Sequence, residues 1–261
     1  MMLTAIPVGF FAGLFGIGGG LITVPFLYFV FELLGIDKMY IMHLAVGTSF
    51  FIIIPTSFVS VFTHNKNNAV DPEVIKSYAI FVVIGVIVGA IFAATLKTKS
   101  LILFFSLIVF FLGTYLMFLK EKSVDIKANF NLLPRILLGF LSGFISAPMG
   151  IGGAVMNVPI LKYFGYPINK AIGSAAAIGF IIALFGVLGF LISGSYLDAN
   201  LPLSIGFINI PAFLIFVPIT TVMAKIGANT MHKLDKNIVT KLFGIFLYIV
   251  GSIFVYRYFN I

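Results

Sequence analysis

The sequence predicts an all-α integral membrane protein built from two sequence-related halves. Hydrophobic residues make up 61% of the 261 positions and charged residues 9%, and the mean hydropathy is +1.18. A soluble domain of this size cannot carry such a composition on its surface. A twelve-residue motif, Gly16–Leu27, returns as Gly150–Leu161 with 7 of its 12 positions identical. Each copy opens with a glycine run inside an apolar stretch, so we expect a helix broken at matching points in both halves.

Each half contains four apolar segments, and a membrane-spanning helix needs about 20 apolar residues. The segments are Leu3–Leu34, Tyr40–Thr63, Ser77–Leu96 and Ser100–Leu119 in the first half, and Ile136–Leu161, Ala171–Leu197, Leu201–Ala224 and Leu242–Tyr256 in the second. A polar stretch separates the two sets. We therefore predict a first membrane repeat at 1–120, a cytoplasmic linker at 121–133 and a second membrane repeat at 134–261.

Three further matches support the duplication. Gly9–Gly13 matches Gly139–Gly143, with about four more residues before the glycine run in the second half. Ala45–Ser49 matches Ala171–Ala175 in the next segment. Asn68–Asp71 is matched with Ser195–Asp198, and the order of the matches is the same in both halves.

The first segment of each half predicts the topology. Leu3–Leu34 has 32 residues, too many for an ordinary crossing, while the pieces on either side of its glycines are too short. If both glycine segments are re-entrant, Lys and Arg divide 12 to 4 between the two sides, against 9 to 7 for eight crossings. The positive-inside rule favours the re-entrant arrangement. It predicts inverted repeats with three spanning helices each and both termini outside; the alternative is eight crossings with parallel halves.

The paired motif, a Gly-x-Gly-Gly-Gly run followed by Val-Pro with a Gly-Thr or Gly-Ser pair in the next segment, resembles the sulfite exporter TauE/SafE family of membrane permeases. The resemblance covers nearly the whole chain and implies export of small sulfur-containing anions such as sulfite or organosulfonates. The second copy departs from the first, because Ala154 replaces the last glycine and Asn157 stands opposite Thr23.

A helix that begins at a glycine run inside the membrane presents unpaired N–H groups, which attract anions. Glycines also allow a ligand to approach the backbone closely. We predict substrate binding at mid-membrane by the two breaks and by hydroxyl and amide side chains near them. The candidate residues are Gly18, Gly19, Gly20, Thr23, Thr48, Ser49, Gly152, Gly153, Ala154, Asn157 and Ser174. The competing interpretation for glycines spaced four apart is close helix packing, which we favour for Gly9, Gly13, Gly85 and Gly89.

The acidic residues constrain the mechanism. All 8 lie at segment ends or in loops, so no central carboxylate is available for proton or sodium coupling. An inside-negative potential favours the exit of an anion by about 2.3 kcal/mol per charge per 100 mV, so export requires no coupling ion. His43, near the Gly-Thr element, is a candidate substrate or proton contact, although a structural hydrogen bond is the commoner role of such a residue.

Other classes of protein are disfavoured. The chain has no cysteine, and its three histidines are scattered, so neither a metal site nor a cofactor is predicted. The net charge of +8 comes from short loops beside apolar segments, which indicates orientation in the membrane and no nucleic-acid binding. No reactive constellation of an enzyme is present at membrane depth. The expected partners are a small anionic substrate and the lipid bilayer of the cell membrane, and no oligomeric state is predicted; the alternative function is an anion channel, or a membrane scaffold without alternating access.

Overall fold

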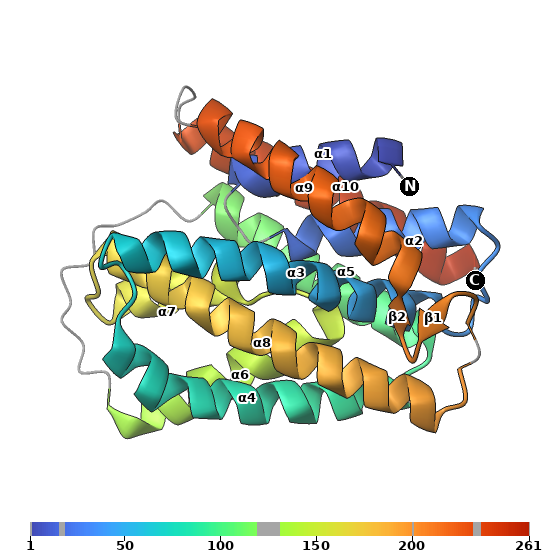
Figure 1. The fold of residues 1–261 in the computed structure, drawn as a ribbon, viewed down its shortest axis with the longest axis horizontal. Coiled ribbons are helices and arrows are strands. Elements are labelled where there is room, and N and C mark those ends of the chain that lie inside the picture. Colours follow the sequence, from blue (N-terminus) through green and yellow to red (C-terminus); the bar gives the residue numbers. More distant parts are fainter. Residues whose placement is uncertain (1, 16–18, 119–130, 200, 232–235, 261) are drawn as a thin grey trace.

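The computed structural model describes residues 2–15, 19–118, 131–199, 201–231 and 236–260. Within these ranges it contains ten α-helices and one short β-hairpin. The helices are α1 (Met2–Phe15), α2 (Gly20–Leu33), α3 (Ile41–Lys66), α4 (Pro72–Thr95), α5 (Thr98–Phe118), α6 (Leu132–Met149), α7 (Ala154–Tyr163), α8 (Ile168–Tyr196), α9 (Ile210–Met231) and α10 (Lys236–Asn260). Figure 1 shows them as one layered bundle, so the all-α prediction is confirmed.

Seven of the described helices are long and apolar enough to cross a membrane. They include the six predicted spans, α3, α4, α5, α8, α9 and α10, and also α6, whose 18 residues reach the minimum length for a span. In contrast, α1 and α2 have 14 residues each. That is about 21 Å of helix against a hydrocarbon core about 30 Å thick. The chain is a multi-pass membrane protein, and its first apolar segment is divided into two short helices, as predicted.

Large apolar side chains cover the outer faces of the bundle. On α5, Leu107 is 60% exposed and Phe111 is 69% exposed, and on α4 Ile91 is 61% exposed. Water would penalise such a surface, whereas lipid chains accommodate it. The exposed apolar faces are therefore those expected to contact the bilayer.

The sequence did not predict the hairpin before α9. Strand β1 (Ser204–Ile205) pairs with β2 (Ile208–Asn209) in antiparallel register, with Ser204 opposite Asn209. Gly206, at the turn, has a φ of 54°, a left-handed conformation that glycine adopts without steric cost. Helix α9 consequently begins at Ile210, nine residues later than the predicted segment Leu201–Ala224.

The N-termini of α4 and α9 are each capped by a side-chain oxygen, which accepts from the N–H of the second residue of α4 and from that of the third residue of α9. The Oδ1 atom of Asp71 accepts a hydrogen bond from the N–H of Glu73 at 3.0 Å. The Oδ1 atom of Asn209 accepts one from the N–H of Ala212 at 2.9 Å. The backbone N–H groups of Asp71 and Asn209 also donate to equivalent hydroxyls, those of Ser174 and Thr48, so Asp71 corresponds to Asn209. The predicted match of Asp71 with Asp198 is wrong, because Asp198 lies just after α8 with a φ of 46°.

The two halves are interleaved. Helix α1 packs along α9 and α4 packs along α6, and these are the most extensive helix pairs in the described bundle (Figure 1). Gly9 of α1 lies against the backbone of Thr220 of α9, and Gly143 of α6 lies against the carbonyl oxygen of Val82 of α4. Thr220 and Val82 are equivalent, each eleven residues after its N-cap residue. In the alignment of the two halves, Gly9 therefore corresponds to Gly143 and not to Gly139. The four extra residues predicted before the second glycine run are absent.

Candidate functional site

Both predicted helix breaks are present. Helix α2 follows Gly19, whose φ is 81°, and α7 follows Gly153, whose φ is 67°. Both conformations are left-handed, which an L-amino acid with a side chain adopts only at a steric cost. This requirement explains why glycine occupies the position directly before each short helix. Gly18 lies outside the described residues.

The two breaks meet inside the bundle. A Cβ atom on Gly20, the first residue of α2, would lie 2.6 Å from the carbonyl oxygen of Gly150 and 2.7 Å from the Cα of Ile151. Ser49 of α3 joins the same contact, since its Oγ donates a hydrogen bond to the Gly150 carbonyl at 2.9 Å. On the other side of the second break, Gly152 lies against Gly179 of α8. The second glycine run is thus enclosed by α2, α3 and α8.

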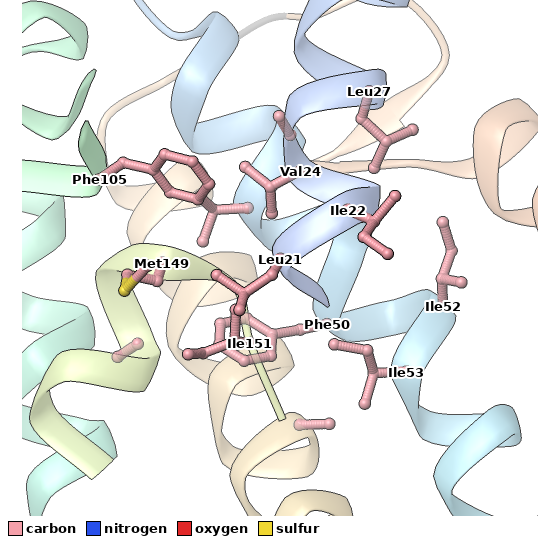
Figure 2. Close-up of a cluster of buried hydrophobic side chains, with 14 of the residues drawn as sticks. Leu21, Ile22, Val24, Leu27, Phe50, Ile52, Ile53, Phe105, Met149 and Ile151 are labelled. Atoms are coloured by element: carbon pink, nitrogen blue, oxygen red, sulfur yellow. The ribbon is translucent and has the colours of Figure 1, made fainter. Parts of the chain in front are cut away.

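Apolar side chains fill the space around this contact. Figure 2 shows Leu21 and Ile22 of α2, Phe50 and Ile53 of α3, and Ile151 gathered where the start of α2 approaches the second break. All five are at most 2% exposed. The junction between the breaks is therefore closed in this conformation.

Two hollows in the described structure lie away from the breaks. The larger one, about 540 Å³, is lined by residues of the segment 194–206 around the hairpin. The smaller one, about 280 Å³, is lined by Glu73, Lys76, Ser77 and Arg135, where α4 and α6 begin. Both are near helix ends.

In each short helix, N–H groups of the first turn donate hydrogen bonds to the carbonyl of the glycine that precedes the helix. The N–H groups of Ile22 and Thr23 point to the Gly19 carbonyl, and the Thr23 Oγ1 donates to the same oxygen at 3.0 Å. In α7 the N–H groups of Met156 and Asn157 point to the Gly153 carbonyl. Among the described residues, the N–H groups of Ala154 and Val155 have no hydrogen-bond partner. They are the free donors expected at a helix N-terminus.

Asn157 is the centre of a buried polar cluster, Tyr78, Ser142, Ser146 and Asn157, all fully buried or nearly so. Its Oδ1 accepts hydrogen bonds from the Tyr78 hydroxyl and the Ser142 hydroxyl, each at 2.9 Å. Its Nδ2 donates to the Gly153 carbonyl at 2.9 Å. The sequence predicted Asn157 but missed Tyr78, Ser142 and Ser146; the two serines four residues apart on one face of α6, just before the break, were the available signal.

The hydroxyls of Thr48 and Ser174 bond to the starts of α9 and α4 and to neither break. The Thr48 hydroxyl accepts a hydrogen bond from the N–H of Asn209, and the Ser174 hydroxyl accepts one from the N–H of Asp71, each at 2.9 Å. The preceding glycines let the helices approach, since Gly47 lies against the Phe207 carbonyl and Gly173 against the Ala69 carbonyl. Each Gly-Thr or Gly-Ser pair therefore holds the start of a helix that belongs to the other half.

His43 joins α3 to the end of α4. Its Nε2 lies 3.1 Å from the carbonyl oxygen of Ala93 and 3.0 Å from that of Leu96. Both neighbours are acceptors, so Nε2 carries the proton and donates to them. The ring also packs against Phe207 at 5.0 Å between centroids. The structure gives His43 a hydrogen-bonding role at the C-terminus of α4, away from the two breaks.

Charge is confined to the ends of the bundle. The buried polar side chains in the described part of the chain include no Asp, Glu, Lys or Arg. Two ion pairs are partly exposed: Arg257 with Glu32 at 2.9 Å, and Lys170 with Asp71 at 3.7 Å. In the same part of the chain, no three His, Asp or Glu residues lie close enough together to hold a metal ion. The interior therefore offers a ligand only neutral donors and backbone dipoles.

A bundle of membrane-spanning helices that encloses two glycine-broken helices is typical of membrane transporters. A family model described as sulfite exporter TauE/SafE matches residues 1–254. The chain belongs to this family. Its location is the cell membrane.

Relatives that match over nearly their full length are described as probable membrane transporter proteins. The chain is 30% identical over 250 residues to a probable membrane transporter protein of Haemophilus influenzae, covering 96% of this chain and 95% of that one. It is 31% identical over 245 residues to one of Methanocaldococcus jannaschii, covering 90% and 86%. It is 25% identical over 280 residues to the probable membrane transporter protein YunE of Bacillus subtilis, covering 98% and 97%. No solved structure matches the chain.

Proposed function

We propose that the protein exports a small anion, sulfur-containing as the family description suggests, by alternating access to a site at the two helix breaks. The observation that carries this proposal is the contact between Gly20 and Gly150 inside the bundle. It brings the start of α2 against the end of α6, four residues before α7 begins, where lipid is absent and where backbone N–H groups can face a ligand. Neutral donors surround the second break, and a preorganised set of such donors suits an oxyanion such as sulfite or a sulfonate.

The orientation in the membrane is part of the proposal. Figure 1 shows α2 returning toward the end of the bundle where both chain termini lie, and α7 returning toward the opposite end. This arrangement supports re-entrant segments that enter from opposite sides, hence inverted repeats. With re-entrant segments, the 12 to 4 division of Lys and Arg supports an orientation with the chain termini outside the cell and the start of α6 in the cytoplasm.

The direction of transport follows from the electrostatics. No buried carboxylate in the described interior offers a site for a coupling cation. An inside-negative potential drives a monovalent anion outward by about 2.3 kcal/mol per 100 mV. Export therefore needs no coupled ion, whereas accumulation inside the cell would require one.

The test has two parts. Purified protein is first screened for thermal stabilisation by sulfite, sulfate, thiosulfate, sulfonates and carboxylates. The stabilising anion is then followed in proteoliposomes while a potassium gradient with valinomycin sets the membrane potential. We expect flux that saturates with the anion and accelerates when the compartment holding it is negative. Linear ohmic current would support the channel alternative, and the absence of both stabilisation and flux would refute the proposal.

A further inference from the structure

The two helix breaks have the same backbone geometry but different chemistry. Ser142 and Ser146 lie eight and four residues before Gly150, the first glycine of the second motif. The residues at the same distances before Gly16 are Val8 and Ala12.

Helices α4 and α9, which pack along the helices before the two breaks, α6 and α1 respectively, also differ in polarity. Tyr78 lies seven residues after the N-cap residue Asp71, and its equivalent, seven residues after Asn209, is Phe216. The second break is therefore surrounded by three hydroxyls and an amide. At the corresponding places, the first break has only the Thr23 hydroxyl.

One polar group at the second break is unused. The Oγ of Ser146 is buried and has no hydrogen-bond partner in the described structure. A buried unsatisfied hydroxyl is costly, so it calls for an explanation such as a bound molecule. Ser146 faces Gly153: its Oγ lies 3.3 Å from the position that a Cβ on Gly153 would occupy, and the Asn157 Nδ2 lies 2.9 Å from the same point. Two donors thus converge beside the start of α7.

The other members of the cluster fix the direction of the Asn157 amide. Its Oδ1 accepts from the hydroxyls of Tyr78 and Ser142, which uses both lone pairs of that oxygen. The Nδ2 must then face Gly153, whose carbonyl accepts one of its two protons. A flipped amide would place two oxygens together. Tyr78 and Ser142 are consequently positioning residues that leave the second Nδ2 proton available to a ligand.

The position that a Cβ on Gly153 would occupy is filled by a side chain that can rotate. The Cδ1 atom of Ile182 on α8 is the nearest atom to that point, and it is the far end of a flexible side chain. Rotation about the χ2 bond of Ile182 would vacate the point between Ser146 and Asn157 without moving the backbone.

We infer that the second break alone binds the anionic head group, through Ser146 Oγ, Asn157 Nδ2 and the N–H groups of Ala154 and Val155, after Ile182 rotates away. This inference rests on the proposed function and assigns its polar contacts to one half of the chain. The site selects monoanions. It offers neutral donors and the fractional charge of a helix N-terminus, about +0.5, and the cost of transferring an ion from water to a low-dielectric site rises with the square of its charge.

The test uses the full-length purified chain and two probes, methanesulfonate as a monoanion and sulfate as a dianion, compared at equal ionic strength against chloride. Thermal unfolding midpoints measured against probe concentration give the affinities. For the unaltered protein we expect stabilisation by methanesulfonate and at least about tenfold weaker binding of sulfate.

Three variants separate a ligand contact from a structural role. Ser146→Ala removes an unsatisfied hydroxyl, so without an anion the unfolding midpoint should stay equal or rise, while methanesulfonate binding weakens about tenfold or more. Ser106→Ala is the matched control, because this buried serine on α5 already donates to the Ile102 carbonyl at 2.7 Å, and its affinity should equal that of the unaltered protein. Ile182→Val removes the atom that fills the site and should strengthen binding severalfold.

The outcomes are distinguishable. Stabilisation of the unaltered protein by methanesulfonate together with unchanged affinity in Ser146→Ala would overturn this inference and leave the proposed function in place. Equal affinities for sulfate and methanesulfonate would overturn the selection of monoanions. No stabilisation and no flux with any anion of the screen would refute the proposed function and, with it, the assigned site.

Discussion

The left-handed glycines that start the short helices allow a quantitative test of how tightly the second break is packed. We compare three substitutions, Gly35→Ala, Gly19→Ala and Gly153→Ala. The φ angles are 71°, 81° and 67°, so the backbone strain on adding a side chain is similar at all three positions. The surroundings differ. A Cβ at Gly35, in the loop after α2, would meet nothing within 4 Å.

The other two positions are crowded to different degrees. At Gly19 the nearest atom would be the Cβ of Ala12 at 3.2 Å. At Gly153 the new Cβ would lie 2.9 Å from the Asn157 Nδ2, which the hydrogen bonds of that amide hold in place, and it would also displace the Cδ1 of Ile182. A left-handed conformation costs a residue with a Cβ about 1–2 kcal/mol. Overpacking of a close-packed core adds about 1–3 kcal/mol.

The expected losses in unfolding free energy are therefore about 1–2 kcal/mol for Gly35→Ala and about 2–5 kcal/mol for Gly153→Ala, with Gly19→Ala between them. The measurement is equilibrium unfolding in mixed micelles of increasing sodium dodecyl sulfate content, followed by circular dichroism because the chain has no tryptophan. Equal losses for Gly35→Ala and Gly153→Ala would refute the packing of the second break described above.

Two further predictions concern the contacts between helices. His43→Leu should lower the unfolding free energy by about 1–3 kcal/mol, because the Ala93 and Leu96 carbonyls lose their donor. In the same unfolding assay, His43→Gln should recover part of this loss. Equal stabilities of the two variants would exclude the hydrogen-bonding role. Gly173→Ala should cost about 3 kcal/mol, because the added Cβ meets the backbone oxygen of Ala69, which cannot rotate away; an unchanged unfolding curve would show that this contact is not close-packed.

The sequence was sufficient to predict the membrane class, the duplication and the position of both breaks. Apolar segment length is set by bilayer thickness, and the left-handed starts of α2 and α7 require glycine, so both features appear directly in the residues. Close packing of glycines was also predictable, and the contacts of Gly9, Gly85 and Gly89 with opposing backbones confirm it. The need for glycine is local to one residue, and the length of an apolar segment depends only on the thickness of the bilayer.

The pairing of residues across the bundle was less predictable. Matching Gly9 with Gly139 was plausible by identity, but the true partner of a packing glycine is set by the helix it faces, which a repeat alignment does not contain. The hairpin before α9 and the equivalence of Asp71 with Asn209 were missed for the same reason. Tyr78 is not predictable from the sequence, because a tyrosine in an apolar helix has no sequence signature of a buried hydrogen bond. A three-dimensional arrangement is needed to bring it to Asn157.

The interleaving of α1 with α9 and of α4 with α6 determines which parts of the molecule can move as rigid units. Backbone-to-backbone glycine contacts resist sliding, since each has a single close fit. A change of shape that exposes the breaks to the other side of the membrane would therefore keep each of these pairs together. In the proposed alternating-access mechanism the mobile units are therefore composites of both repeats, and the boundary between the two sequence halves is not the boundary along which the protein would open.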